Sequence, residues 1–146
     1  MKNWPWYLSA LGAAMVWGVH YPLVDNALKR VSPATVLLLT AIPILVFALL
    51  AHRTVGEDFA TLRALGWRTQ LPILALALTS LAGSILLYVA IGAKNATLAS
   101  VIEISYPLFV AIFAWVLFRQ AHWNLAVAAG GLLVFAGVAL IIVNNR

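Results

Sequence analysis

The chain has 146 residues, of which 64% are hydrophobic and only 9% are charged. Soluble domains are typically about half apolar and about a quarter charged, so this composition excludes an ordinary water-soluble protein and favours a membrane protein. The absence of cysteine excludes disulfide scaffolds and thiolate sites, and four acidic residues leave little room for a paired-carboxylate enzyme. Despite the net charge of +5, the basic residues are scattered singly between apolar runs, so no nucleic-acid partner is expected.

Five apolar stretches are long enough to cross a bilayer, which takes about 20 helical residues. Backbone polar groups in lipid must be satisfied within their own segment, so each stretch is predicted to be a helix. We therefore expect an all-α polytopic membrane protein that forms one domain over residues 1–146. The predicted spans are residues 6–24, 33–51, 71–93, 97–118 and 125–143.

The longest connection, residues 52–70, has apolar residues at helical spacing. This pattern predicts a short helix that lies on the membrane surface, although a plain polar loop remains an alternative. Three charged residues are assigned to the side away from the apolar face. The apolar residues are Phe59, Leu62 and Leu65, and the charged residues are Glu57, Asp58 and Arg63.

The basic residues are almost equally divided between the two sides of the membrane. Five spans place the termini on opposite sides, with five lysines and arginines on the N-terminal side and four on the other. After the loop acids are subtracted (5 − 2 and 4 − 1), each side carries +3. The positive-inside rule needs an imbalance, so this chain is predicted to insert in both orientations, unless the longer loop decides. The basic residues on the N-terminal side are Lys2, Arg53, Arg63, Arg68 and Arg119. Those on the other side are Lys29, Arg30, Lys94 and Arg146.

Glu103 is the only acidic residue inside a predicted span. It lies six residues into the fourth span, about 9 Å from that end of the helix at about 1.5 Å per residue. A carboxyl group at membrane depth is costly and is a functional candidate, and apolar surroundings penalise its charged form. Glu103 is therefore a candidate proton carrier; the alternative is a structural acid that pairs with His20 or bonds to a tyrosine.

Other polar residues are expected at a similar depth on three helices. Ser84 and Tyr88 share one face of the third span. His20 lies near the end of the first span, and the alternative for this residue is a packed histidine that carries no proton. Tyr21 is interpreted as a membrane-interface residue. The candidate solute- and proton-binding residues are Glu103, His20, Tyr106, Tyr88, Ser100, Ser84 and Trp17.

Three prolines lie within predicted spans and are expected to break their helices. Pro107 has no N–H to donate to the carbonyl of Glu103, four residues earlier. Broken helices that line a cavity are a recurring feature of transporters. The predicted break positions are Pro107, Pro22 and Pro43.

The last span has small residues at Ala126, Gly130 and Gly137, which would let another helix approach closely. We predict a dimer interface there, with internal packing against the preceding helix as the alternative. The chain has no metal-ligand spacing, phosphate loop or nucleophile motif, so no enzymatic activity, cofactor or metal is expected.

Several short motifs occur in a fixed order along nearly the whole chain. They are Trp17-Gly18, Ser32-Pro33, the run from Ala96 through Pro107 to Arg119, and the glycine-rich last span with Gly131 and Gly137. Together they resemble the EamA domain of the drug/metabolite transporter superfamily. Many members carry a glutamate just after the fourth helix, where this chain has Gln120.

The resemblance implies a multi-pass transporter of small metabolites or drugs in a prokaryotic inner membrane. Many members contain two such domains in inverted orientation, so a single EamA-like repeat would pair with a second copy in antiparallel fashion. The implied partners are a small-molecule solute, the lipid bilayer and a second copy or a similar single-domain subunit. A different hypothesis is a non-transporting membrane subunit that assembles with a partner protein or a lipid-processing enzyme.

Overall fold

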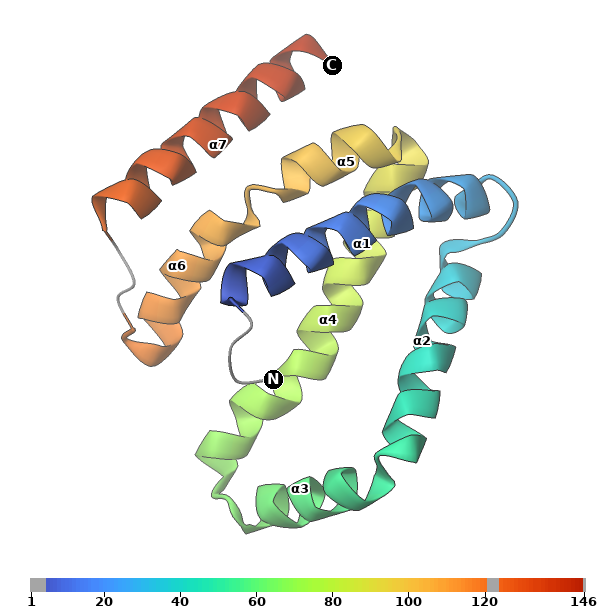
Figure 1. Ribbon diagram of the computed structural model, residues 1–146, viewed down its shortest axis with the longest axis vertical. Coiled ribbons are helices and arrows are strands. Elements are labelled where there is room, and N and C mark those ends of the chain that lie inside the picture. Colours follow the sequence, from blue (N-terminus) through green and yellow to red (C-terminus); the bar gives the residue numbers. More distant parts are fainter. Residues whose placement is uncertain (1–4, 121–123, 146) are drawn as a thin grey trace. The chain divides into compact units, whose positions relative to one another are not determined.

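The computed structural model describes residues 5–120 and 124–145, and in these ranges the chain forms seven helices and no strand (Figure 1). The all-α prediction is confirmed for this part of the chain. Lys2 and Arg146, which entered the charge count, lie outside the described residues. The helices are α1 (Trp6–Leu28), α2 (Pro33–Leu50), α3 (His52–Ala64), α4 (Trp67–Ala93), α5 (Ala96–Glu103), α6 (Tyr106–Phe118) and α7 (Leu125–Asn144).

Four segments among the described residues are long and apolar enough to cross a membrane: α2, α4, Ala96–Phe118 and α7. Their large apolar side chains are mostly exposed, as with Leu50 (79%) and Leu133 (75%). Exposed apolar surface of this extent is unfavourable in water and suits contact with lipid. The multi-pass membrane prediction is therefore confirmed. Helix α1 is a continuous helix of 23 residues but is not among the four, so the count of five spans stays a prediction.

The contacts group the chain into two compact units. The first contains α1 as far as Pro22 together with the chain from Ala93 onward, which includes α5, α6 and α7. The second, Leu23–Gly92, contains the end of α1, all of α2 and α3, and α4 apart from its last residue.

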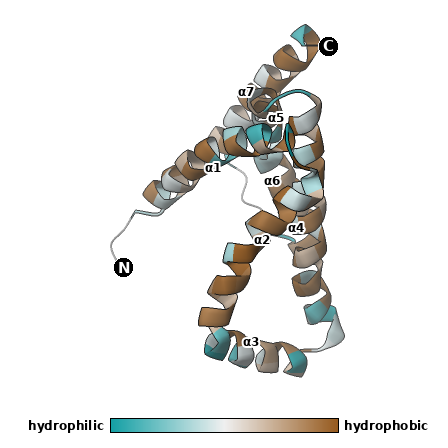
Figure 2. Cartoon of the chain, turned by 90° about the vertical axis from the view of Figure 1, so that its right-hand side faces the viewer, coloured by the Kyte–Doolittle hydropathy of each residue, from teal (hydrophilic) through white to brown (hydrophobic). Residues whose placement is uncertain are grey.

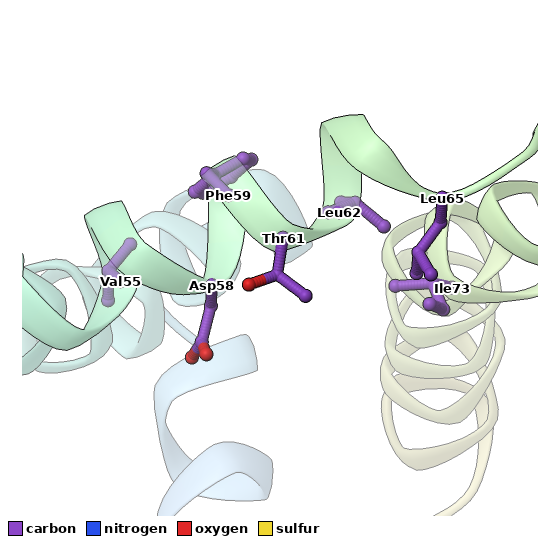
Figure 3. A pocket seen from close by; sticks show the side chains of 7 residues that line it. All are labelled: Val55, Asp58, Phe59, Thr61, Leu62, Leu65 and Ile73. Carbon is purple, nitrogen blue, oxygen red and sulfur yellow. The ribbon is translucent and has the colours of Figure 1, made fainter.

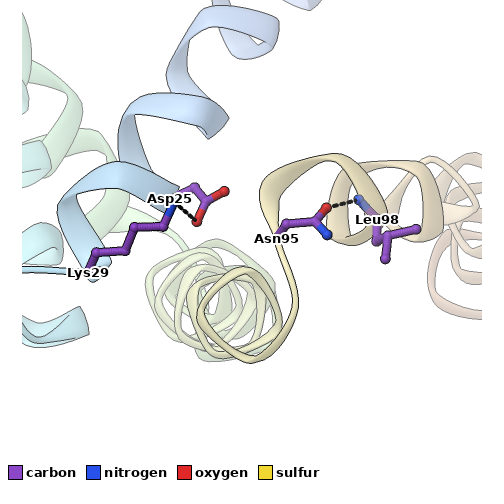
Figure 4. Close-up of polar contacts among 4 residues, drawn as sticks. All are labelled: Asp25, Lys29, Asn95 and Leu98. Atoms are coloured by element: carbon purple, nitrogen blue, oxygen red, sulfur yellow. Dashed lines mark hydrogen bonds and ion pairs between the residues drawn. The ribbon is translucent and has the colours of Figure 1, made fainter. Parts of the chain in front are cut away.

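In the first unit, α6 and α7 pack closely at Gly131. A Cβ atom built at this glycine would overlap the side chain of Leu108 on α6. The hairpin before α5 is joined to the end of α7, because Lys94 Nζ donates to the carbonyl oxygen of Asn145 over 3.3 Å. Helix α5 is capped by Asn95, whose Oδ1 accepts from the Leu98 N–H at 2.8 Å (Figure 4).

In the second unit, residues 52–64 form the helix α3, so the loop alternative for this part of the connection is wrong. Helix α3 carries hydrophilic patches, whereas α2 is almost wholly hydrophobic (Figure 2). The Gln70 side chain on α4 donates to the Leu62 carbonyl at 3.0 Å and to the Leu65 carbonyl at 2.6 Å, which fixes the turn between α3 and α4. Near the end of α1, Asp25 and Lys29 form an ion pair at 3.6 Å (Figure 4).

Proline breaks only one of the three helices in which a break was predicted. The helix from Ala96 ends at Glu103 and resumes at Tyr106, directly before Pro107, and the ribbon is interrupted between α5 and α6 (Figure 1). Pro22 and Pro43 lie inside the continuous helices α1 and α2, so the breaks predicted there are wrong. A proline removes one hydrogen bond, and the bonds on either side can keep a membrane helix intact.

Candidate solute and proton site

Glu103 is the last residue of α5 and lies at the break before α6. The backbone closes the end of α5 with short-range bonds: the Ile104 N–H donates to the Ser100 carbonyl at 3.0 Å and the Ser105 N–H to the Ile102 carbonyl at 3.2 Å. The Ser105 hydroxyl donates to the same Ile102 carbonyl at 2.8 Å. These short-range bonds end α5. Pro107 lies in the first turn of α6, where a backbone N–H has no partner within the helix, so its missing N–H costs little.

The Glu103 carboxylate accepts a hydrogen bond from Tyr21 on α1. The Tyr21 hydroxyl lies 2.6 Å from Glu103 Oε2, and the two residues are 82 positions apart in the chain. This distance is that of a hydroxyl–oxygen hydrogen bond, and a bond from a tyrosine is what the structural-acid alternative for Glu103 expects. The bond is partly buried, so it connects α1 to the end of α5 in a setting where water competes only in part.

Tyr21 belongs to a cluster of rings on one side of α1. Trp17 meets His20 edge-on with ring centroids 5.1 Å apart, and Trp17 meets Tyr21 at 5.5 Å. His20 and Tyr21 are themselves 6.2 Å apart. Contacts of this kind favour particular orientations of the rings, so the cluster helps to position the Tyr21 hydroxyl that donates to Glu103. Among the described residues, His20 forms no ion pair with Glu103.

The other candidates divide between the two units. In the first unit, the Ser100 hydroxyl donates to the Thr97 carbonyl at 3.0 Å, and Tyr106 begins α6 with 58% of its surface exposed. In the second unit, Ser84 and Tyr88 both lie on α4, where Tyr88 is buried with 5% exposure. Contacts through Tyr21 thus bring Trp17, His20 and Glu103 together in the first unit. Ser84 and Tyr88 belong to the second unit.

Tyr21 is the site residue that the sequence reasoning missed. Its place near the end of the first predicted span favours an interface role instead. Trp17 and Tyr21 are four residues apart and therefore share a helix face, which places Tyr21 beside the candidates Trp17 and His20. That spacing was the one local signal of its position.

The small residues of α7 fall into two groups. Ala126, Gly130 and Gly137 are exposed, and among the described residues no side chain or other helix comes within 4 Å of a Cβ built at either glycine. Gly131 instead packs against Leu108 of α6. The internal-packing alternative is therefore correct at Gly131, while the predicted interface residues form an open face of α7.

The fold and this site together define a class of protein: a polytopic helical membrane protein with an acidic side chain at a helix break. The chain also matches the family model described as the EamA-like transporter family over residues 4–143. This match covers nearly the whole chain, so the protein belongs to the EamA-like transporter family. Comparison with curated proteins and with solved structures finds no match. Membership in this family makes membrane transport, and not catalysis, the class of function that the findings support.

Proposed function

We propose that this protein is a secondary transporter that moves a small metabolite or drug-like solute across the membrane, with Glu103 as its proton carrier. The observation that carries the proposal is the position of Glu103, an acidic residue within the candidate span Ala96–Phe118, at the break between α5 and α6 in a chain of a transporter family. A carboxyl group in a membrane span is costly to keep and is therefore a functional candidate.

The Tyr21–Glu103 bond suggests how a proton and a solute could compete. The Tyr21 hydroxyl donates to Glu103 Oε2, the side-chain atom that would also receive the transported proton. A proton on Oε2, or a solute amine or hydroxyl that donates to it, would take the place of the Tyr21 donor. Because α5 and α6 are separate helices, α6 can move without bending a continuous hydrogen-bond ladder, and such movement is the alternating-access step.

We further propose that two copies form an antiparallel homodimer and enclose the transport cavity between them. Two features of the chain support this arrangement: the nearly equal charge of its two sides and the open small-residue face of α7 at Ala126, Gly130 and Gly137. A similar single-domain subunit could take the place of the second copy. Tyr106, Ser100, Ser84 and Tyr88 stay candidate solute-binding residues in this proposal. The membrane would be the inner membrane of a prokaryote.

Proteoliposomes with a pH gradient across the membrane test the transport proposal. Wild-type protein is offered amino acids, simple sugars and the fluorescent cation ethidium, and proton movement is followed with a pH-sensitive dye inside the vesicles. We expect proton-coupled flux of at least one solute, and loss of that flux in Glu103→Gln. Glu57→Gln is the matched control, because Glu57 lies on α3 outside the predicted spans, and it should transport like the wild type.

Two results would contradict the proposal. Full proton-driven flux in Glu103→Gln would remove Glu103 as the carrier. The absence of flux for any solute, with protein that is folded in the vesicles, would favour the non-transporting subunit.

A further inference from the structure

A second candidate site belongs to the second unit, whereas Glu103 belongs to the first. An open pocket of about 400 Å³ is formed between α3 and the first turns of α4 (Figure 3). Its lining is mainly apolar and includes Val55, Phe59 and Leu62 from α3 and Ile73 from α4. Two polar side chains, Asp58 and Thr61, complete the α3 side of the pocket.

Asp58 lies on the apolar face of α3 and not on the opposite side. The predicted place on the polar side is wrong, because Val55, Asp58 and Leu62 follow the three- and four-residue steps of one helix face. No described residue forms a hydrogen bond or ion pair with the Asp58 carboxylate. The Thr61 hydroxyl donates to the Glu57 carbonyl at 3.0 Å, so its oxygen keeps lone pairs that can accept a hydrogen bond.

The chemistry of this lining selects its ligand. One carboxylate and one hydroxyl acceptor on an apolar wall suit a cationic group that is attached to an apolar body. A primary ammonium has three N–H donors and can bond to Asp58 and Thr61 together. A quaternary ammonium has no such donors and is usually held by several aromatic rings, whereas Phe59 is the one aromatic residue of the lining.

The position of α3 identifies the source of that ammonium group. Helices α2 and α4 are both candidate membrane spans, so α3, which joins them, lies at a membrane surface. Lipid headgroups occupy this depth and acyl chains lie just below it. A phospholipid with an ethanolamine headgroup would place its amine at Asp58 and its apolar part along Val55, Leu62 and Ile73.

We propose that the pocket between α3 and α4 binds the headgroup of a phospholipid that carries a primary amine, through Asp58 and Thr61. The proposal is independent of the transport function, since it concerns a different unit and different residues. It assigns a role to an acidic residue that the transport mechanism does not use.

Native mass spectrometry of the purified protein tests this proposal. The protein is mixed with equal amounts of phosphatidylethanolamine and phosphatidylcholine of identical acyl chains, and the lipids that remain bound are counted. A hydrogen bond to a charged group predicts a preference of about tenfold or more for phosphatidylethanolamine. Asp58→Asn should remove this preference, while Glu57→Gln, which changes a neighbouring acid outside the pocket lining, should retain it.

A second variant covers the case in which Asp58→Asn fails to fold. Thr61→Val keeps the side-chain shape, removes the hydroxyl acceptor and should reduce the preference by a smaller factor than Asp58→Asn. Equal retention of the two lipids by the wild type would overturn the proposal. The proposal would also be overturned if folded Asp58→Asn preferred phosphatidylethanolamine as strongly as the wild type does. If only Thr61→Val folds, an unchanged preference in that variant would overturn it.

Discussion

Replacement of Gly131 by valine tests the packing of α6 against α7. A Cβ atom at this position would overlap Leu108 Cδ2 and would come within 3.3 Å of Leu108 Cγ, and valine adds two methyl groups beyond it. Overpacking of this kind costs about 1–3 kcal/mol. For a chain near this length, each kcal/mol lowers the melting temperature by about 2–4 °C.

Thermal unfolding of the purified protein in detergent, followed by far-ultraviolet circular dichroism, measures the effect. Gly83→Val is the matched control, because no side chain or other helix of the described residues comes within 4 Å of a Cβ built at Gly83. Its melting temperature should stay above that of Gly131→Val. The double variant Gly131→Val with Leu108→Ala should recover part of the loss, since Leu108 is the clashing group. Equal melting temperatures for Gly131→Val and Gly83→Val would refute the close approach of α6 and α7.

Three further substitutions have separate expected outcomes. Tyr21→Phe removes a hydrogen bond to a charged group, so it should destabilise the protein by about 1.5–3 kcal/mol in thermal unfolding, whereas Tyr7→Phe, at an exposed site, should not. Asn124→Ala removes the cap of α7, whose side chain accepts from the Val127 N–H, and should cost about 1 kcal/mol in the same assay. Pro107→Ala restores a backbone donor and favours a continuous helix from α5 into α6, so vesicle assays should then show slower flux.

The long apolar runs made the helices predictable from sequence. A run of about 20 apolar residues has few alternatives to a membrane helix, because its backbone must satisfy its own hydrogen bonds. The break before Pro107 was predictable for a similar reason, since proline removes a local bond. Pro22 and Pro43 show the limit of that rule, because one missing bond does not end a helix by itself.

Contacts between distant residues were not predictable from sequence. Tyr21 and Glu103 are 82 positions apart, and no local pattern of residues states that α1 reaches the end of α5. Gly130 and Gly131 are neighbours in sequence, yet only Gly131 packs against Leu108, because helix rotation decides which of them faces α6. Asp58 was misplaced because its charge, and not its position on the helix, determined the predicted face.

The release of protons when a solute binds tests the central claim most directly. Purified protein in weakly buffered detergent is mixed with the solute that gives flux in the vesicle assay, and the pH of the solution is followed. If protonated Glu103 gives up its proton when the solute binds, the wild type should acidify the solution on solute addition and Glu103→Gln should not. Equal proton release from both proteins would contradict the account, as would binding of the solute to the wild type without any release.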